Sequence, residues 1–213
     1  DGATNSLVNL NDVEINIGER DSSKAANIDI HFAHIQGGTF LKADGYARYG
    51  SFSFTDSTID SCGGMYIWYP TSDSLFARNI FKDTPEIQIL TNKAAGKGNV
   101  SFENNIFYDT KPLYGSVIKN LASYGGELLV TKNSFMNNAR VALEIPENYN
   151  NTNINAKSNW FNTTDINEIN ARILDKNDDM ILHNNDYVIH KLIGMKPVRS
   201  ISTQSLILVT IMP

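Results

Sequence analysis

The sequence predicts an all-β solenoid, a parallel β-helix in which the chain winds into stacked coils. The first observation is a repeated unit, clearest in residues 99–109, where two alternating apolar residues lead into Asn105 and Phe107 follows two positions later. The second is the period, because an apolar anchor recurs in steps of 24, 22, 26, 28 and 26 residues. A period of roughly 20–50 residues indicates one supersecondary unit per coil. The anchors are Ile35, Ile59, Phe81, Phe107, Phe135 and Phe161.

A third observation is the abundance of Asn, which accounts for 26 of the 213 residues. Asn is unfavourable inside helices and strands but tolerates the left-handed backbone of tight turns. A solenoid needs several turns in every coil, so it suits this composition. The content of hydrophobic residues, 41%, and of charged residues, 19%, is that of a folded protein.

The repeat divides the chain into four parts. Residues 1–26 are expected to form an opening coil that caps the N-terminal end, and residues 27–162 the β-helix itself. In each coil an apolar pair such as Phe52 and Phe54 precedes the anchor, and a second inward strand follows, as at Met65 and Ile67. Each coil is expected to carry two or three short strands. The extra residues between 112 and 126 are expected to loop out on one face.

A change of pattern after residue 162 predicts a C-terminal cap over residues 163–186. Asp165 is placed as an N-cap and Glu168 follows three residues later, which is a capping-box arrangement. We expect a short helix from about Ile166 to Leu174 that closes the open end of the solenoid. The tail, residues 187–213, has two interpretations: strands folded back along the solenoid, or a poorly ordered end.

Stacking of the coils in register predicts a column of buried amides. Like residues then lie above one another at the strand spacing of about 4.8 Å, and each amide can donate to the next. We also expect Asn to occupy the left-handed corner. The Phe anchors form an aromatic column beneath. The structural Asn column consists of Asn79, Asn105, Asn133 and Asn159.

These repeats resemble the right-handed parallel β-helix proteins of the pectate-lyase-like superfamily, and most closely its bacterial β-helix repeat group. The likeness rests on three segments of the form N-N-x-F, namely Asn104-Asn-Ile-Phe107, Lys132-Asn-Ser-Phe135 and Ser158-Asn-Trp-Phe161. It covers about residues 27–180 and implies a right-handed helix, for which we expect about six to seven coils from the repeat. Two departures from the family pattern are Asn162 in place of Gly and Ile166 in place of Pro. The group includes lyases, hydrolases, tailspikes and adhesins, so the resemblance implies a fold rather than one activity.

Composition excludes several classes of function. The net charge is −5 and there is no basic stripe, so we expect no nucleic-acid partner. Cys62 is the single cysteine, which excludes an intrachain disulfide and predicts a small buried hydrophobe. The most apolar run, residues 206–212, is too short to span a membrane. The polar start at Asp1 indicates no signal peptide, so we expect a mature form or an excised domain.

Outward aromatic residues are the strongest candidates for a binding site. Strand alternation leaves several of them outside, next to the preceding coil. Aromatic faces flanked by polar groups suit sugar rings. The alternative is that these side chains pack under the loop at 112–126 or under the tail. The candidate ligand-binding residues are Tyr66, Trp68, Tyr69, Tyr46, Tyr49 and Lys42.

A catalytic site has less support in the sequence. Polysaccharide lyases of this fold need a proton-abstracting base and a neutraliser for the uronate carboxylate, often Ca²⁺, and glycosidases need a pair of carboxylates. The outward positions form no carboxylate pair. What remains is His31, grouped in one coil with His34, Asp29, Lys42 and Asp44. We take His31 and Asp44 as the catalytic candidates, against the alternative of a solvated surface.

No cofactor is expected, and Ca²⁺ is the one cation that the sequence leaves open. Asp175, Asn177, Asp179 and Asp186 have the spacing of a calcium loop, but Met180 replaces its obligatory Gly. A solvated turn is the favoured interpretation.

The sequence therefore predicts a non-catalytic module that binds a polysaccharide through outward aromatic residues. We expect it to be secreted or exposed on a bacterial or phage surface. One alternative is a polysaccharide lyase or glycoside hydrolase. A further alternative is a structural spacer or adhesin stalk without a ligand. The sequence does not indicate an oligomeric state.

Overall fold

The structure is a computed structural model that describes a defined part of the chain. The described residues are 6–7, 9–11, 27–38, 50–68, 70–91, 98–123, 126–136, 139–145, 154–175, 188–189 and 210–211. Most of the opening coil that the sequence predicts for residues 1–26 lies outside these ranges.

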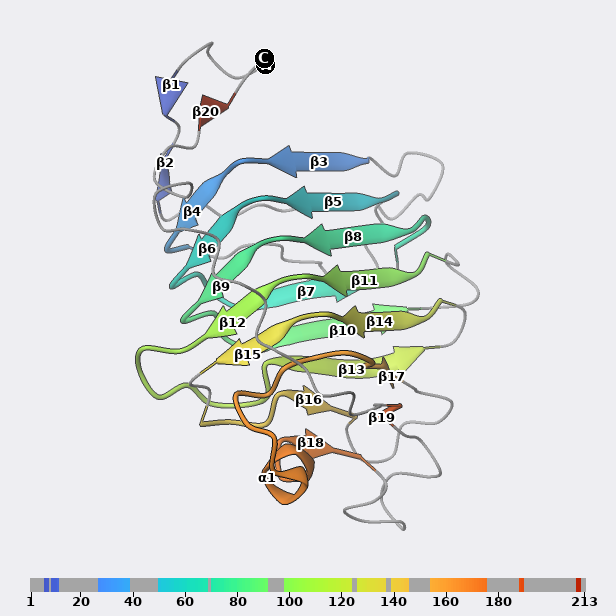
Figure 1. Cartoon of the computed structure of the whole chain (residues 1–213). Coiled ribbons are helices and arrows are strands. Elements are labelled where there is room, and N and C mark those ends of the chain that lie inside the picture. The colour runs from blue at the N-terminus through green and yellow to red at the C-terminus, as the bar shows by residue number, and fades with distance from the viewer. Residues whose placement is uncertain are drawn as a thin grey trace.

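Within the described residues the strands stack into three parallel sheets that run along the molecule (Figure 1). Sheet 1 contains β3 (Ile28–His31), β5 (Phe52–Thr55), β8 (Ser74–Ala77), β11 (Val100–Glu103), β14 (Leu128–Thr131), β17 (Ile154–Asn155) and β19 (Val188–Ile189). Sheet 2 contains β2 (Asn9–Asn11), β4 (His34–Gln36), β6 (Thr58–Asp60), β9 (Ile80–Lys82), β12 (Ile106–Tyr108) and β15 (Ser134–Met136). Sheet 3 contains β7 (Met65–Trp68), β10 (Ile87–Thr91), β13 (Ile118–Ser123), β16 (Leu143–Glu144) and β18 (Ile173–Leu174). In addition, β1 (Ser6–Leu7) pairs antiparallel with β20 (Thr210–Ile211).

The predicted fold class, a parallel β-helix, is confirmed, with a smaller number of coils than expected. Four complete coils contribute one strand to each sheet: β5-β6-β7, β8-β9-β10, β11-β12-β13 and β14-β15-β16. The coil that begins with β3 has described strands in sheets 1 and 2 only. The coil that begins with β17 passes through a helix before it reaches β18. The sequence count of six to seven treated every apolar anchor as the start of a full coil.

Stacked phenylalanines fill the interior. The strand register places Phe76 beside Phe102 and Phe81 beside Phe107, and these two pairs of ring centroids are both 4.7 Å apart. The second column continues through Phe135 to Phe161, the last step being 5.3 Å. Each stacked pair contributes roughly 0.5–1.5 kcal/mol beyond the burial of its area.

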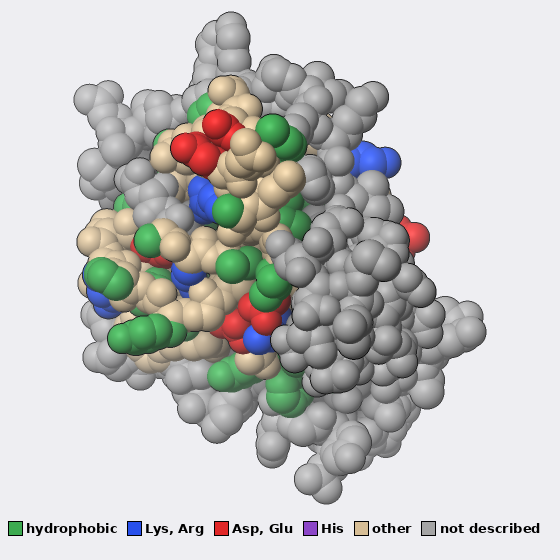
Figure 2. All heavy atoms as spheres, turned by 90° about the horizontal axis from the view of Figure 1, so that it is seen from below, with side chains coloured by type: hydrophobic (Ala, Val, Ile, Leu, Met, Phe, Trp, Pro, Cys, Tyr) green, Lys and Arg blue, Asp and Glu red, His purple; other side chains and the backbone are tan. Residues whose placement is uncertain are grey.

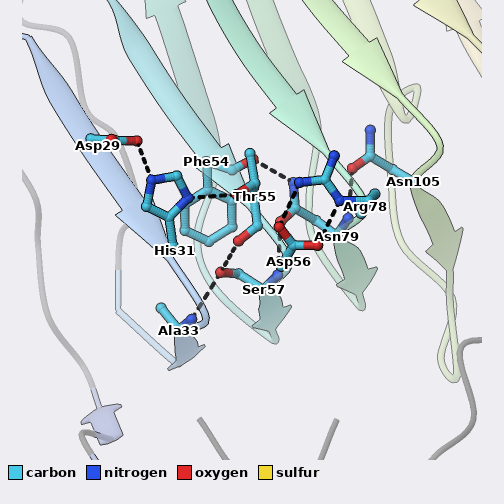
Figure 3. Close-up of polar contacts among 10 residues, drawn as sticks. All are labelled: Asp29, His31, Ala33, Phe54, Thr55, Asp56, Ser57, Arg78, Asn79 and Asn105. Carbon is cyan, nitrogen blue, oxygen red and sulfur yellow. Dashed lines mark hydrogen bonds and ion pairs between the residues drawn. The ribbon is translucent and has the colours of Figure 1, made fainter. Parts of the chain in front are cut away.

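Buried Asn side chains link the coils at the corner between sheets 1 and 2 (Figure 3). The Oδ1 atom of Asn105 accepts a hydrogen bond from the backbone N–H of Asn79 at 2.9 Å. Its Nδ2 atom donates to the carbonyl oxygen of Phe76 at 2.8 Å and to Oδ1 of Asn133 at 3.0 Å. Asn133 repeats this pattern with Asn159. Each amide therefore satisfies backbone groups of the preceding coil as well as its neighbour in the column.

The left-handed residue at this corner is not the Asn of the column, so that expectation was wrong. The residue immediately before it has the positive φ, as in Arg78 (58°), Asn104 (55°), Lys132 (59°) and Ser158 (65°). The buried amide must point inward to reach the carbonyl of the penultimate residue of the sheet 1 strand in the preceding coil, as Asn105 reaches Phe76. The chain reverses at the preceding residue, whose side chain is left outside.

The C-terminal helix is shorter than predicted. It is α1 (Ile166–Asn170), capped by Asp165, whose side chain accepts from the N–H groups of Asn167 and Glu168. Ile173 and Leu174 form β18 instead, because they pair with β16 at the end of sheet 3. In a capping box the Glu side chain accepts from the backbone N–H of the N-cap residue, but here the Thr163 hydroxyl lies between Glu168 and that N–H. This hydroxyl contacts the Glu168 carboxylate and also accepts from the backbone N–H of Asp165.

Candidate functional site

The outer face of sheet 3 brings together aromatic and polar side chains from four coils. Strand alternation buries Met65 and Ile67 and turns their neighbours outward. The parallel register then aligns one outward residue of each coil along the stack. We call these four residues the sheet 3 row: Tyr66, Gln88, Lys119 and Glu144.

Two of the predicted aromatic residues lie together at one end of this row. The rings of Tyr66 and Trp68 are 5.6 Å apart in an edge-to-face arrangement, and both residues are half-buried. The Trp68 Nε1 atom is shielded from solvent and has no hydrogen-bond partner among the described residues. The other four candidates, Tyr69, Tyr46, Tyr49 and Lys42, lie outside the described residues.

An ionic cluster occupies the other end of the row. The Nζ atom of Lys119 lies 2.8 Å from Oε1 of Glu144 and 3.7 Å from Oε2 of Glu86. Oε1 of Glu86 accepts from Nε2 of Gln88 at 2.9 Å. Burial alone would lower the pKa of Lys119, but the hydrogen bond and charge of Glu144, with the charge of Glu86, raise it overall. Lys119 is therefore protonated at neutral pH.

A loop of residues 109–117, between β12 and β13, borders this cluster and projects beyond the strands in Figure 1. Asp83 of the preceding coil holds its start by accepting from the N–H groups of Thr110 and Lys111. Glu86 holds its end by accepting from the N–H and hydroxyl of Ser116. At its tip Tyr114 is 96% exposed. A fully exposed aromatic ring on an anchored loop is a ready contact for a ligand.

A buried ion pair fastens the two ends of this loop to each other. Arg140 Nε lies 3.1 Å from Asp109 Oδ2 at the start of the loop, and both side chains are buried. Arg140 Nη1 also donates to the carbonyl oxygen of Ser116 at the end of the loop, at 2.9 Å. Its remaining Nη2 donates to the carbonyl oxygen of Thr84 at 2.6 Å. The loop is therefore held in place at both ends.

A second polar network surrounds His31 on the outer face of sheet 1 (Figure 3). Oδ1 of Asp29 lies 2.8 Å from Nε2 of His31, and Oγ1 of Thr55 lies 2.6 Å from Nδ1. Hydrogen bonds from Ser53 and His31 lower the pKa of Asp29. Beside them, Arg78 forms a two-pronged ion pair with Asp56, with both N–O distances 2.6 Å.

The order carboxylate, imidazole, hydroxyl is that of a nucleophilic triad, but the surroundings do not suit one. A carboxylate only accepts, so Nε2 of His31 donates to Asp29, while Nδ1 lies beside the Thr55 hydroxyl. Thr55 is buried, so its hydroxyl is not presented to a substrate. The second catalytic candidate, Asp44, lies outside the described residues. His34 is on β4, half-buried, and its Nε2 atom is shielded.

The described residues hold no group of three or more His, Cys, Asp or Glu side chains arranged to bind a metal ion. Of the calcium-like set only Asp175 is described, and it is buried. Cys62 lies in the core, where burial raises the pKa of its thiol to about 12. Such a thiol is not a nucleophile at neutral pH.

At the end of the stack that carries α1, the described residues form no surface of a single charge. Figure 2 shows this end, where acidic, basic and hydrophobic side chains of the described residues are interspersed. Among the described residues, no helix is both long and apolar enough to cross a membrane.

Sequence reasoning missed Glu86, Lys119 and Tyr114. It took residues 112–126 for an insertion, but they include β13. Asn120 is buried at the position that Ile89 occupies in the preceding coil, so the apolar alternation is broken there. A register shift after Ile89 disturbs the pattern further. The apolar pair Val117 and Ile118 could have indicated that the inward strand begins again after the loop, because both residues are buried.

Comparison with known proteins gives one family match. The family described as a right-handed beta helix region matches residues 15–161. No match was found among curated proteins or among solved structures.

Proposed function

Because the chain belongs to the right-handed β-helix family, a fold that hosts many activities, we propose that it is a non-catalytic carbohydrate-binding module. Its binding surface is the outer face of sheet 3. The observation that carries this proposal is the edge-to-face pair of Tyr66 and Trp68 next to a row of hydrogen-bonding side chains.

The chemistry of this face matches that of a sugar. A pyranose ring has an apolar face, which packs against an aromatic side chain, and a rim of hydroxyl groups. Gln88, Lys119 and Glu144 offer donors and acceptors at intervals set by the strand spacing, about 4.8 Å. A glycan chain that lies along the stack of coils therefore meets aromatic contacts first and polar contacts beyond them.

The anchored loop adds a third aromatic residue. Tyr114 is joined to Gly115, where a Cβ atom on the backbone would lie only 2.8 Å from Oε2 of Glu86. The loop tip therefore lies beside the carboxylate that also approaches Lys119. An aromatic side chain on a fixed backbone loses little conformational entropy when it binds. A polysaccharide partner implies a secreted or cell-surface location, which is part of the same proposal.

Glycoside hydrolysis is the second candidate, because Glu86 and Glu144 approach the same ammonium group. A glycosidase needs two carboxyl groups that face the scissile bond, one of them protonated. Here Lys119 stands between the two carboxylates and compensates one of their two charges. A lyase needs a base, and the raised pKa of Lys119 keeps it protonated. These features favour binding over catalysis.

The test is affinity electrophoresis and calorimetry with a panel of polysaccharides, using wild type, Trp68→Ala and Tyr114→Ala. We expect the Trp68 variant to bind about tenfold more weakly, which corresponds to ~1.4 kcal/mol. Phe32→Ala is the matched control, because Phe32 is an exposed aromatic residue that precedes the corner between sheets 1 and 2. Its affinity should equal that of wild type.

Product assays separate the three functions. Reducing ends or unsaturated products released by wild type would establish an enzyme instead. A complete lack of binding and turnover would leave the structural spacer. Equal loss in the Phe32 and Trp68 variants would place binding away from sheet 3.

A further inference from the structure

The charge of the sheet 3 cluster is unbalanced. Two carboxylates, from Glu86 and Glu144, share the single ammonium group of Lys119. The side chain of Glu86 is 19% exposed, that of Glu144 14% and that of Lys119 24%. Interactions between partly buried charges are screened less by salt than those at an open surface. The cluster therefore presents a net negative charge to any ligand on this face.

The positive charge of Lys119 is already engaged. Its Nζ atom lies 2.8 Å from Glu144, the closer of its two partners. An anionic ligand group could reach the ammonium only by displacing that carboxylate, and it would then lie beside two like charges. Lys119 is also the only cation in the sheet 3 row. A uronate carboxylate finds no uncompensated partner there.

Two hydrogen-bond acceptors in the same row have no partner among the described residues. Glu144 contacts Lys119 through Oε1, and its Oε2 atom has no partner among the described residues. Gln88 uses its Nε2 atom on Glu86, which leaves its carbonyl oxygen without a partner in the same part of the chain. Two free acceptors suit a ligand that donates hydroxyl protons.

From these observations we infer that the sheet 3 face selects uncharged polysaccharides and rejects polyuronates. The inference rests on the proposed glycan-binding function and names its ligand class. One ring of a neutral polysaccharide packs against the aromatic pair, and hydroxyl groups further along the same glycan chain donate to Gln88 and Glu144. A polyuronate of the same backbone places a carboxylate against the cluster and is repelled.

The experiment compares each neutral polysaccharide with its own charged form. The probes are a β-glucan, a mannan and a galactan, each beside the polyuronate made from it by oxidation at C6, and binding is measured by calorimetry at low salt. We expect at least one neutral polymer to bind tenfold or more tightly than its oxidised form. Equal or tighter binding of the oxidised forms would overturn this inference and leave the glycan-binding function standing. Binding of none of the six would overturn both.

A charge-neutral variant tests whether the cluster causes the discrimination. Glu144→Gln keeps the shape and an acceptor, removes one negative charge and frees Lys119 from its closer partner. We expect the ratio of the affinity for the neutral polymer to the affinity for its oxidised form to fall at least fivefold in this variant. Glu103→Gln, which makes the same change of charge on sheet 1, is the control and should leave both affinities unchanged. Equal discrimination in wild type and Glu144→Gln, with unchanged melting temperature, would overturn the assignment to this cluster.

Discussion

At the scale of single residues, the corner between sheets 1 and 2 depends on buried amides that serve backbone groups. Asn105 satisfies the N–H of Asn79 and the carbonyl oxygen of Phe76, both in the preceding coil. Those groups are buried, so water cannot replace the amide. The same column changes chemistry in the earlier coils. Ser57 takes the position, and its hydroxyl accepts from the N–H of Ala33 at 2.8 Å.

We predict that Asn105→Ala lowers the free energy of unfolding by about 3 kcal/mol. The substitution leaves the buried N–H of Asn79 without its partner and removes a hydrogen bond to the carbonyl oxygen of Phe76, and an unpaired buried group costs roughly 1–3 kcal/mol. Urea denaturation followed by circular dichroism measures the change. Binding at sheet 3 is expected to be unaffected at temperatures where the variant is folded.

Asn105→Ser is the matched control, because Ser already occupies the equivalent position of the column at Ser57. A hydroxyl at this position can still accept from the N–H of Asn79, as Ser57 does for Ala33. Its loss of stability should fall between zero and that of the Ala variant. Equal losses in the two variants would show that the cavity, rather than the hydrogen bonds, dominates the cost.

At the scale of elements, the loop of residues 109–117 is fixed by carboxylates of the preceding coil. Asp83 is buried and accepts from Thr110 and Lys111. Burial alone would raise the pKa of Asp83, but the hydrogen bonds from the hydroxyl and N–H of Thr110 and from the N–H of Lys111 lower it overall. An exposed loop is usually mobile, and here the buried carboxylate supplies the constraint.

We predict that Asp83→Asn loosens this loop and speeds chymotrypsin cleavage after Tyr114 at least threefold. Asn tolerates the positive φ of this position, 49°, so the backbone turn is retained while the charge is lost. Cleavage is followed by mass spectrometry under native conditions. Asp60→Asn, which removes a half-buried carboxylate of β6 paired with Lys82, is the control and should leave the cleavage rate unchanged.

The stability that Asp83 contributes also depends on pH in a defined direction. Because the folded pKa lies below the unfolded value, about 3.9, the contribution is present above that value. It is lost as the pH falls through the folded pKa. The difference in melting temperature between wild type and Asp83→Asn should therefore be constant above pH ~5 and shrink below pH ~4. A difference that grows on acidification would contradict the role given to this carboxylate.

At the scale of the whole molecule, the fold could be predicted because its core repeats in the sequence. Ile59, Phe81 and Phe107 recur with the coil and lie side by side in sheet 2, so their spacing revealed the stack. The ionic cluster does not repeat. Glu86 and Lys119 are brought together by the register of β10 and β13, and no periodic pattern indicates a contact formed once. The aromatic pair was predictable because Tyr66 and Trp68 alternate with buried Met65 and Ile67.

The same stacking predicts that one whole coil can be removed without loss of the fold. Deletion of residues 52–73 joins Ser51 to Ser74, which takes the place of Phe52 beside Ile28, and Asn79 takes the place of Ser57. Oδ1 of Asn79 can then accept from the N–H of Ala33. Because a solenoid is held together by contacts between neighbouring coils, we expect a single cooperative transition. The m value should fall by roughly a tenth with the surface removed.

Two further measurements test this prediction: glycan binding by the whole-coil deletion, and folding of a deletion that removes only half a coil. The whole-coil deletion removes Tyr66 and Trp68, so glycan binding should disappear while the protein stays folded. Deletion of residues 52–62 alone moves strands of one sheet onto another and places inward residues outside, so that variant should not fold. Circular dichroism and urea denaturation distinguish the two. An unfolded whole-coil deletion would mean that stability depends on contacts beyond neighbouring coils, whereas binding that survives it would place the glycan on another face.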